Sequence, residues 1–264
     1  MSQQPVAGRR RTLDDRQWLE AMGIDPFWIE SGADAVSSTA SASEPAAPAA
    51  AEQRTPRPQR PAVPRSVPMS TDREGHTEWS DLEAAIRNCN ACTLCKGRKQ
   101  AVPGTGDRQA RWLMVGEAPG AEEDAAGLPF VGKAGKLLDA MLAALGLNRQ
   151  SGVYVANAVK CRPPENRTPE GAEIDACNHF LNQQIDWIQP EVIVVLGRPA
   201  AYAVLGREAS IQSLRGTVHT REQGNRRIPV VVTYHPAYLL RQPEEKWKAW
   251  QDLLLAQSAL TGTH

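Results

Sequence analysis

The stretch from Trp112 to Val131 limits the possible fold more than any other part of the chain. It reads W-L-M-V-G-E-A-P-G-A-E-E-D-A-A-G-L-P-F-V, and its four leading apolar residues, bounded by Gly116, predict a short buried strand. A Gly- and Pro-rich turn follows and carries four acidic residues: Glu117, Glu122, Glu123 and Asp124. A strand that ends in such a loop is typical of an α/β sheet with a site at its carboxyl edge.

A helix is expected directly after this turn. The second half of the stretch, G-L-P-F-V-G-K-A-G, presents Phe130 and then opens an amphipathic segment at Ala134–Leu145. Its apolar stripe consists of Leu137, Leu138, Met141, Leu142 and Leu145. Gly146 follows as a stop signal. The acids and the aromatic ring are therefore expected together at one edge of the sheet.

From Glu78 onward the pattern predicts one folded domain, 78–264. Strands are predicted at Arg111–Val115, Val153–Asn157, Glu191–Leu196 and Pro229–Thr233. Helices alternate with them at Ala134–Leu145, Pro169–Trp187, Pro199–Leu205 and Glu244–Leu260. This alternation predicts an α/β fold with a mainly parallel sheet. Residues that follow three of the strands, Glu117, Asn157 and His235, should then meet in one crevice.

The chain before residue 78 has a different organisation. Residues 1–30 contain one short predicted helix, in which Trp18, Leu19 and Met22 follow Thr12 as the N-cap. Residues 31–77 are mostly Ala, Ser, Pro, Gln and Arg. Such a segment buries too little apolar surface to fold, so a disordered linker is expected. The helix either docks on the domain or binds a protein partner through residues 12–30, and both interpretations stay open.

Charge and hydropathy argue against three classes of protein: strongly basic nucleic-acid binders, membrane-spanning proteins and secreted proteins. Thirty basic and thirty acidic side chains give no net charge, unlike a strongly basic nucleic-acid binder, so any contact with nucleic acid needs a local patch. No apolar run approaches the roughly 20 residues that cross a bilayer. The arginines at positions 9–11 are not followed by the apolar segment of a secretion signal. A cytoplasmic protein without a membrane partner, and a monomer, is expected.

Cysteines form the second strong pattern. The five are Cys89, Cys92, Cys95, Cys161 and Cys177. In an intracellular chain, a close C-x-x-C and two distant cysteines predict a zinc or iron–sulfur site rather than disulfides, and no His lies at zinc-finger spacing. The alternative is a set of buried apolar thiols. Because Cys92 and Cys95 also form a C-x-x-C, the spacing leaves open which two of the three clustered cysteines are ligands.

Several long motifs lie between about Cys89 and Arg241. They are C-x-x-C, V-P-G-x-G, V-G-E-A-P-G-x-x-E-D, G-x-P-F-V-G-x-A-G-x-L-L, N-x-V-K-C-R-P-P-x-N-R-x-P, V-L-G and H-P-A-Y-L-L-R. Together they closely resemble the family 4 uracil-DNA glycosylases, an iron–sulfur branch of that superfamily. The resemblance implies a three-layer α/β/α fold with a central, mainly parallel four-stranded sheet. It also implies removal of uracil from single- or double-stranded DNA, and a [4Fe–4S] cluster held by Cys89, Cys92, Cys161 and Cys177, with Cys95 as an extra thiol.

Carried over by position, the resemblance assigns roles to three residues. Phe130 would stack on a uracil flipped out of the DNA. Asn157 would read the base by donating to a uracil oxygen and accepting from N3–H, a pattern that cytosine lacks. His235 would donate a hydrogen bond to uracil O2, where negative charge develops as the glycosidic bond breaks.

Water activation departs from the pattern of the wider superfamily. Where many members carry Asp or Asn before the motif's proline, this chain has Ala118, which offers only backbone groups to the substrate. Glu117 is the natural candidate, because a carboxylate can activate water or stabilise an oxocarbenium-like sugar. Its alternative role is to order the loop. Glu123 or Asp124 would wall off the C5 position of uracil against a thymine methyl, unless Asp124 caps the next turn.

Four cations bracket the predicted crevice and are expected to meet DNA phosphates. They are Lys160, Arg162, Arg167 and Arg241. Leu239 and Leu240, just after His235, either wedge into the gap left by the flipped base or pack in the core.

Two other functions are considered. One is a non-catalytic iron–sulfur module that binds DNA or senses damage. The other is a glycosylase that captures uracil covalently through an inserted, His-containing basic loop. The segment at 130–138 reads F-V-G-K-A-G-K-L-L and has neither insertion nor His, which counts against the covalent variant.

Overall fold

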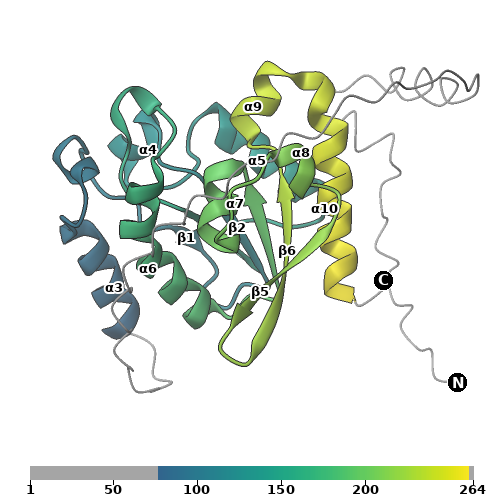
Figure 1. Cartoon of the computed structure of the whole chain (residues 1–264), viewed down its shortest axis with the longest axis horizontal. Helices are drawn as coiled ribbons and strands as arrows, with labels where there is room; N and C mark the ends of the chain where they lie inside the picture. The colour runs from purple at the N-terminus through teal and green to yellow at the C-terminus, as the bar shows by residue number, and fades with distance from the viewer. Residues whose placement is uncertain (1–76, 262–264) are drawn as a thin grey trace, which may run out of the picture.

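A six-stranded sheet organises the computed structural model, which describes residues 77–261 (Figure 1). The strand order is β1-β3-β2-β4-β6-β5. The strands are β1 (Thr105–Gly106), β2 (Trp112–Gly116), β3 (Val153–Asn157), β4 (Val192–Leu196), β5 (Val218–Gln223) and β6 (Arg226–Thr233). The predicted helix within residues 1–30 and the predicted linker lie outside the described residues, apart from position 77.

The four central strands, β3, β2, β4 and β6, run parallel to one another, as predicted. Every residue of β2, β3 and β4 is buried. These strands read as continuous apolar runs because helices cover both of their faces. In the register, Gly116 lies beside Asn157, and Leu196 lies beside Thr233. The carboxyl ends of all four strands therefore reach the same edge of the sheet.

Helices on the two faces make two separate cores. One face packs against α3 (Thr77–Asn88), α6 (Gly171–Ile188) and α7 (Arg198–Leu205) and receives alternate side chains such as Leu113 and Val115. The other face packs against α5 (Lys133–Ala144) and α10 (Lys246–Thr261) and receives Trp112 and Met114. In Figure 1, α3 and α10 lie on opposite sides of the sheet. The arrangement is the expected three-layer α/β/α fold.

Short helices occupy the loops. They are α4 (Ala121–Ala126), α8 (Ile211–Leu214) and α9 (Pro236–Arg241), with 3₁₀ turns η1 (Thr93–Lys96), η2 (Pro164–Asn166) and η3 (Pro243–Glu245). Among residues 77–261, no helix is long and apolar enough to cross a membrane.

The sheet is wider than the four strands predicted from the sequence. β1 and β5 add one antiparallel strand at each edge, and β6 begins at Arg226, before the predicted Pro229. β5 reads V-H-T-R-E-Q and is at most partly buried, so it lacks the apolar pattern that marks a strand in sequence. β1 contains only two residues.

Candidate active site

Loops that follow the parallel strands meet in one cleft at the carboxyl edge of the sheet. Eight of the predicted site residues line it: Glu117, Ala118, Glu123, Phe130, Asn157, Arg167, His235 and Arg241. Gly197, Arg198, Tyr234 and Tyr238 line it as well, although the sequence analysis gave them no role. The predicted residues Lys160, Arg162 and Leu240 are not in its lining.

The amide of Asn157 lies at the end of β3 with 1% of the residue exposed. Within the described part of the chain, its Oδ1 atom is buried and has no hydrogen-bond partner. A buried acceptor without a donor is costly, so such an atom in a cleft indicates a place for a ligand's donor group. Gly116 makes the arrangement possible, because a Cβ there would collide with Oδ1 of Asn157 and lie 2.6 Å from Cζ of Phe130.

Phe130 is held in an unusual backbone conformation. Its φ is 54°, in the left-handed region that a bulky residue rarely adopts. Arg149 fixes this loop by donating from Nη1 to the carbonyl oxygen of Pro129 and from Nη2 to that of Phe130, both at 2.8 Å. The phenyl ring stacks on the imidazole of His235, with centroids 5.4 Å apart and an interplanar angle of 26°. The ring is therefore fixed beside both Asn157 and His235.

His235 is the N-cap of α9, and this position determines its tautomer. Its Nδ1 atom accepts a hydrogen bond of 3.1 Å from the backbone N–H of Ala237. Burial, with a further contribution from Arg241, lowers the pKa of His235 to about 4. The imidazole is therefore neutral near pH 7, and the remaining proton is on Nε2. A neutral ring with a fixed N–H can donate one hydrogen bond.

Glu117 directly follows β2, and its partly buried carboxylate lies beside the N-terminus of α7. Gly197, the N-cap of that helix, has a φ of 96°, and a Cβ there would collide with Oε1 of Glu117. Burial raises the pKa of Glu117 to about 7, although Arg198 and Arg241 act in the opposite direction. A carboxyl group with this pKa can accept a proton at neutral pH.

The two other acids of the turn order the backbone. Glu123 lines the cleft, but its Oε1 atom accepts from the N–H groups of Val131 and Gly132, and its Oε2 atom accepts from that of Gly120. Asp124 is buried outside the cleft lining, and its Oδ1 atom accepts from the N–H of Lys99 at 2.9 Å. Asp124 therefore neither contacts the cleft nor caps the following turn. It ties α4 to the segment before β1.

The phosphate contact predicted for Lys160 is wrong. This residue is 1% exposed, and its Nζ atom donates to the carbonyl of Asn157 and to Oε1 of Gln184. Burial lowers the pKa of Lys160 to about 8. An ammonium group enclosed in this way cannot reach DNA. Sequence shows the charge of a residue but not its depth.

The other predicted DNA-binding residues lie nearer the surface. Arg162 is half-buried and donates to Oδ1 of Asn166, and Arg167 is exposed and makes a bidentate ion pair with Glu173. Arg241 is exposed at the cleft. Leu240 is 44% exposed, whereas Leu239 is 1% exposed and belongs to a core. Of the two leucines, only Leu240 is thus free to contact a ligand.

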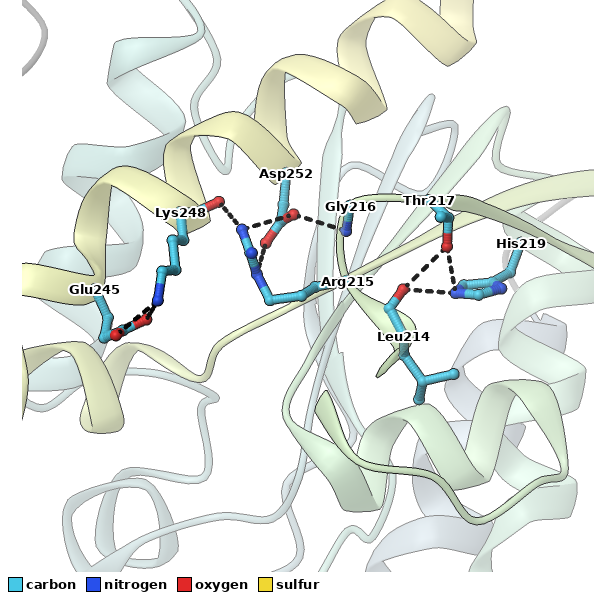
Figure 2. A network of polar contacts seen from close by, with 8 residues as sticks. All are labelled: Leu214, Arg215, Gly216, Thr217, His219, Glu245, Lys248 and Asp252. Atoms are coloured by element: carbon cyan, nitrogen blue, oxygen red, sulfur yellow. Dashed lines mark hydrogen bonds and ion pairs between the residues drawn. The ribbon is translucent and has the colours of Figure 1, made fainter. Parts of the chain in front are cut away.

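A partly buried ion pair connects the loop after α8 to α10 (Figure 2). The guanidinium of Arg215, after α8, donates to both carboxylate oxygens of Asp252 on α10, each at 3.2 Å. The N–H of Gly216 donates to the same carboxylate. Arg215 also lies over the ring of Tyr234, 5.5 Å from its centroid. These contacts fasten the loop after α8 and the residue before His235 to α10.

All five cysteines line a second cavity, together with Arg98 and Lys160. None forms a disulfide, and Cys161 and Cys177 are buried. Arg98 donates from Nη1 to Sγ of Cys161 at 2.9 Å, and the backbone N–H of Lys160 donates to Sγ of Cys177 at 3.4 Å. Burial raises the pKa of Cys177 to about 11.

Within residues 77–261, no three Cys, His, Asp or Glu side chains are placed to hold a single metal ion. A four-iron cluster binds one thiolate at each iron, so its ligands lie farther apart than those of one ion. Thiols that surround one cavity, with cationic and N–H donors directed at two sulfur atoms, fit such a group.

Comparison with known proteins identifies the fold. The family model of the uracil DNA glycosylase superfamily matches residues 103–254. The chain belongs to this superfamily. The match includes all the residues that line the cleft and two of the cysteines, Cys161 and Cys177.

Individual members of the superfamily are similar over most of their length. A type-4 uracil-DNA glycosylase of Pyrobaculum aerophilum is 43% identical over 178 residues, which cover 66% of this chain and 90% of the relative. That of Thermotoga maritima is 47% identical, over 59% of this chain and 80% of the relative. A type-5 uracil-DNA glycosylase of Thermus thermophilus is 34% identical, over 59% of this chain and 86% of the relative. The resemblance to the type-4 branch found in the sequence is confirmed.

Proposed function

We propose that this protein is a uracil-DNA glycosylase of base excision repair. It hydrolyses the N-glycosidic bond between uracil and deoxyribose in DNA, releases free uracil and leaves an abasic site. The observation that carries the proposal is the unpaired Oδ1 atom of Asn157 in a cleft that also holds a fixed aromatic ring and a neutral histidine. The names of the type-4 relatives point to the same activity. Chromosomal DNA as the substrate would place the enzyme in the cytoplasm.

Recognition of the base follows from the donors and acceptors in the cleft. A uracil flipped out of DNA presents an N3–H group, which can donate to Oδ1 of Asn157. Cytosine presents an acceptor at N3, so it would leave two lone pairs facing each other. Phe130 provides the surface on which the flipped base stacks. The carboxylate of Glu123 would contribute indirectly, because it accepts hydrogen bonds from the backbone of the loop that carries Phe130 and so keeps that side of the cleft in place.

Bond cleavage needs a donor for the departing base and an activated water. The Nε2–H group of His235 would stabilise negative charge on uracil O2, because it is held in place before the reaction. Glu117 would accept a proton from water and would also stabilise positive charge on the sugar. Ala118 contributes only its backbone to this part of the site.

DNA is proposed to bind across the mouth of the cleft. Arg167 and Arg241 line the mouth and can contact phosphates, and Arg162 lies on the same loop as Arg167. The exposed side chain of Leu240 is the candidate wedge that fills the gap left by the flipped nucleotide. Both single- and double-stranded DNA are proposed substrates.

The cysteine cavity is proposed to hold a [4Fe–4S] cluster through Cys89, Cys92, Cys161 and Cys177, with Cys95 beside it. Hydrolysis transfers no electrons, so the role of the cluster would be structural: it would connect the segment at 89–95 to the loop after β3 and to α6.

If the cluster is present, the purified protein should be brown and contain about four irons per chain. Cys161→Ala should lose most of that iron and unfold at a lower temperature, because ligation and folding are coupled. Stoichiometric zinc without iron, after anaerobic purification, would contradict the cluster.

The decisive test of the function is release of free uracil. Under excess substrate, the protein with its iron intact should release uracil from a uracil-containing oligonucleotide through many turnovers. The matched oligonucleotide with cytosine at the same position is the control and should release no base. Binding to uracil-containing DNA without any release would instead support the non-catalytic DNA-binding module.

A further inference from the structure

Lys160 is a buried cation that the proposed chemistry does not use. It follows Asn157 by three residues and immediately precedes Cys161. The residue lines the cysteine cavity, and its ammonium group donates a hydrogen bond to the backbone carbonyl of Asn157, the proposed base-reading residue. Lys160 is therefore located between the two sites of the molecule.

The backbone and the side chain of Lys160 both form hydrogen bonds. Its backbone N–H donates to Sγ of Cys177 at 3.4 Å, and its carbonyl accepts from the N–H of Val102 at 2.8 Å. Its ammonium donates to the carbonyl of Asn157 at 2.9 Å and to Oε1 of Gln184 at 2.6 Å. Gln184 donates in turn to the carbonyl of Pro103 at 2.8 Å. The side chain of Lys160 thus links the last residue of β3 to the turn that leads to Cys161.

Packing alone does not account for an ammonium group at this position. Within the described part of the chain, no carboxylate forms an ion pair with Lys160. A buried charge without an ion-pair partner is costly, and an apolar side chain of similar volume would fill the space at lower cost. What the ammonium adds is two directed hydrogen bonds. One of them fixes the backbone carbonyl of Asn157. It thereby limits rotation of the backbone that carries the side-chain amide proposed to read the base.

We propose that Lys160 is a positioning residue that aligns the amide of Asn157 with the base and joins the uracil site to the cysteine cavity as one rigid unit. The proposal rests on the proposed function of the cleft. Gln184 is the second residue of this unit, because it anchors the ammonium to the segment before β1.

The test uses Lys160→Met in the full-length, iron-containing protein. Affinity for free uracil, measured by calorimetry on chains that retain iron, should fall roughly tenfold, as expected for loss of a charged hydrogen bond that positions the reading group. Discrimination between uracil and cytosine in oligonucleotides should fall as well. Lys136→Met, the same change on the exposed side of α5, is the matched control and should keep the affinity of the wild-type protein.

A second variant covers the case in which Lys160→Met does not fold. Gln184→Leu leaves every cysteine and Lys160 in place but removes one acceptor of the ammonium, and it should weaken uracil binding in the same direction. If the wild-type protein releases uracil but the folded variants bind uracil with wild-type affinity, the positioning role is wrong. If the wild-type protein itself neither binds nor releases uracil, the proposed function fails instead.

Discussion

Single-turnover release of uracil should slow by about 10²–10³-fold when His235 is replaced by Ala, because one preorganised donor to the developing anion is lost. The structure supports a donor rather than a base. The N–H of Ala237 occupies Nδ1, and burial keeps the pKa of His235 at about 4. Binding of uracil-containing DNA should change far less, since the hydrogen bond strengthens only as charge develops on the ring.

Two measurements make this prediction specific. His179→Ala removes an exposed imidazole from α6 and should leave the rate unchanged. The rate of the wild-type enzyme should show no step from His235 between pH 5 and 8, because the neutral form dominates throughout this range. Wild-type single-turnover cleavage by the His235→Ala variant would assign the role to another donor.

The parallel core of the fold was accessible from the sequence. β2, β3 and β4 are completely buried, so each appears as an apolar run bounded by polar or special residues, and β6 ends in such a run. Their order along the chain then predicts that Glu117, Asn157 and His235 meet. β5 could not be predicted in this way, because it is a polar edge strand that gains its structure from pairing with β6.

Some residues support the site through contacts with residues far away in the sequence, and no sequence pattern marks them. Arg149 locks the loop of Phe130, and Arg215 binds Asp252 across 37 positions of the chain. Each looks like an ordinary surface cation until the fold brings its partner close. Lys160 shows the opposite error, because this cation was expected to contact DNA phosphates at the crevice and is buried. Depth and long-range pairing are properties of the packed chain and not of local sequence.

Replacing Glu117 by Gln should slow single-turnover cleavage by about 10²-fold or more, the usual contribution of a general base. The pH profile gives a sharper test. Burial raises the pKa of Glu117 to about 7, so the wild-type rate should fall about tenfold per pH unit below 7 and level off above it. The Gln variant should lose this acidic limb.

Arg198→Ala should shift the acidic limb of the pH profile to higher pH, because Arg198 favours the ionised carboxylate of Glu117 and its loss raises the pKa of that group.

The position of Glu117 can be tested without changing the carboxylate itself. Gly197 and Gly206 are the two caps of α7, and both have positive φ angles, 96° and 67°. Gly206 is in the αL conformation (ψ 20°), which an Ala adopts at modest cost, whereas Gly197 (ψ 168°) lies in a region that only glycine readily occupies, so Ala at Gly197 carries the larger backbone strain. A Cβ at Gly197 would collide with Oε1 of Glu117, whereas a Cβ at Gly206 meets no atom within 4 Å. Gly197→Ala should slow cleavage by roughly tenfold or more through displacement of the carboxylate, and Gly206→Ala should affect only stability. Equal rates for the two variants would mean that the close contact between Glu117 and α7 does not matter for the reaction.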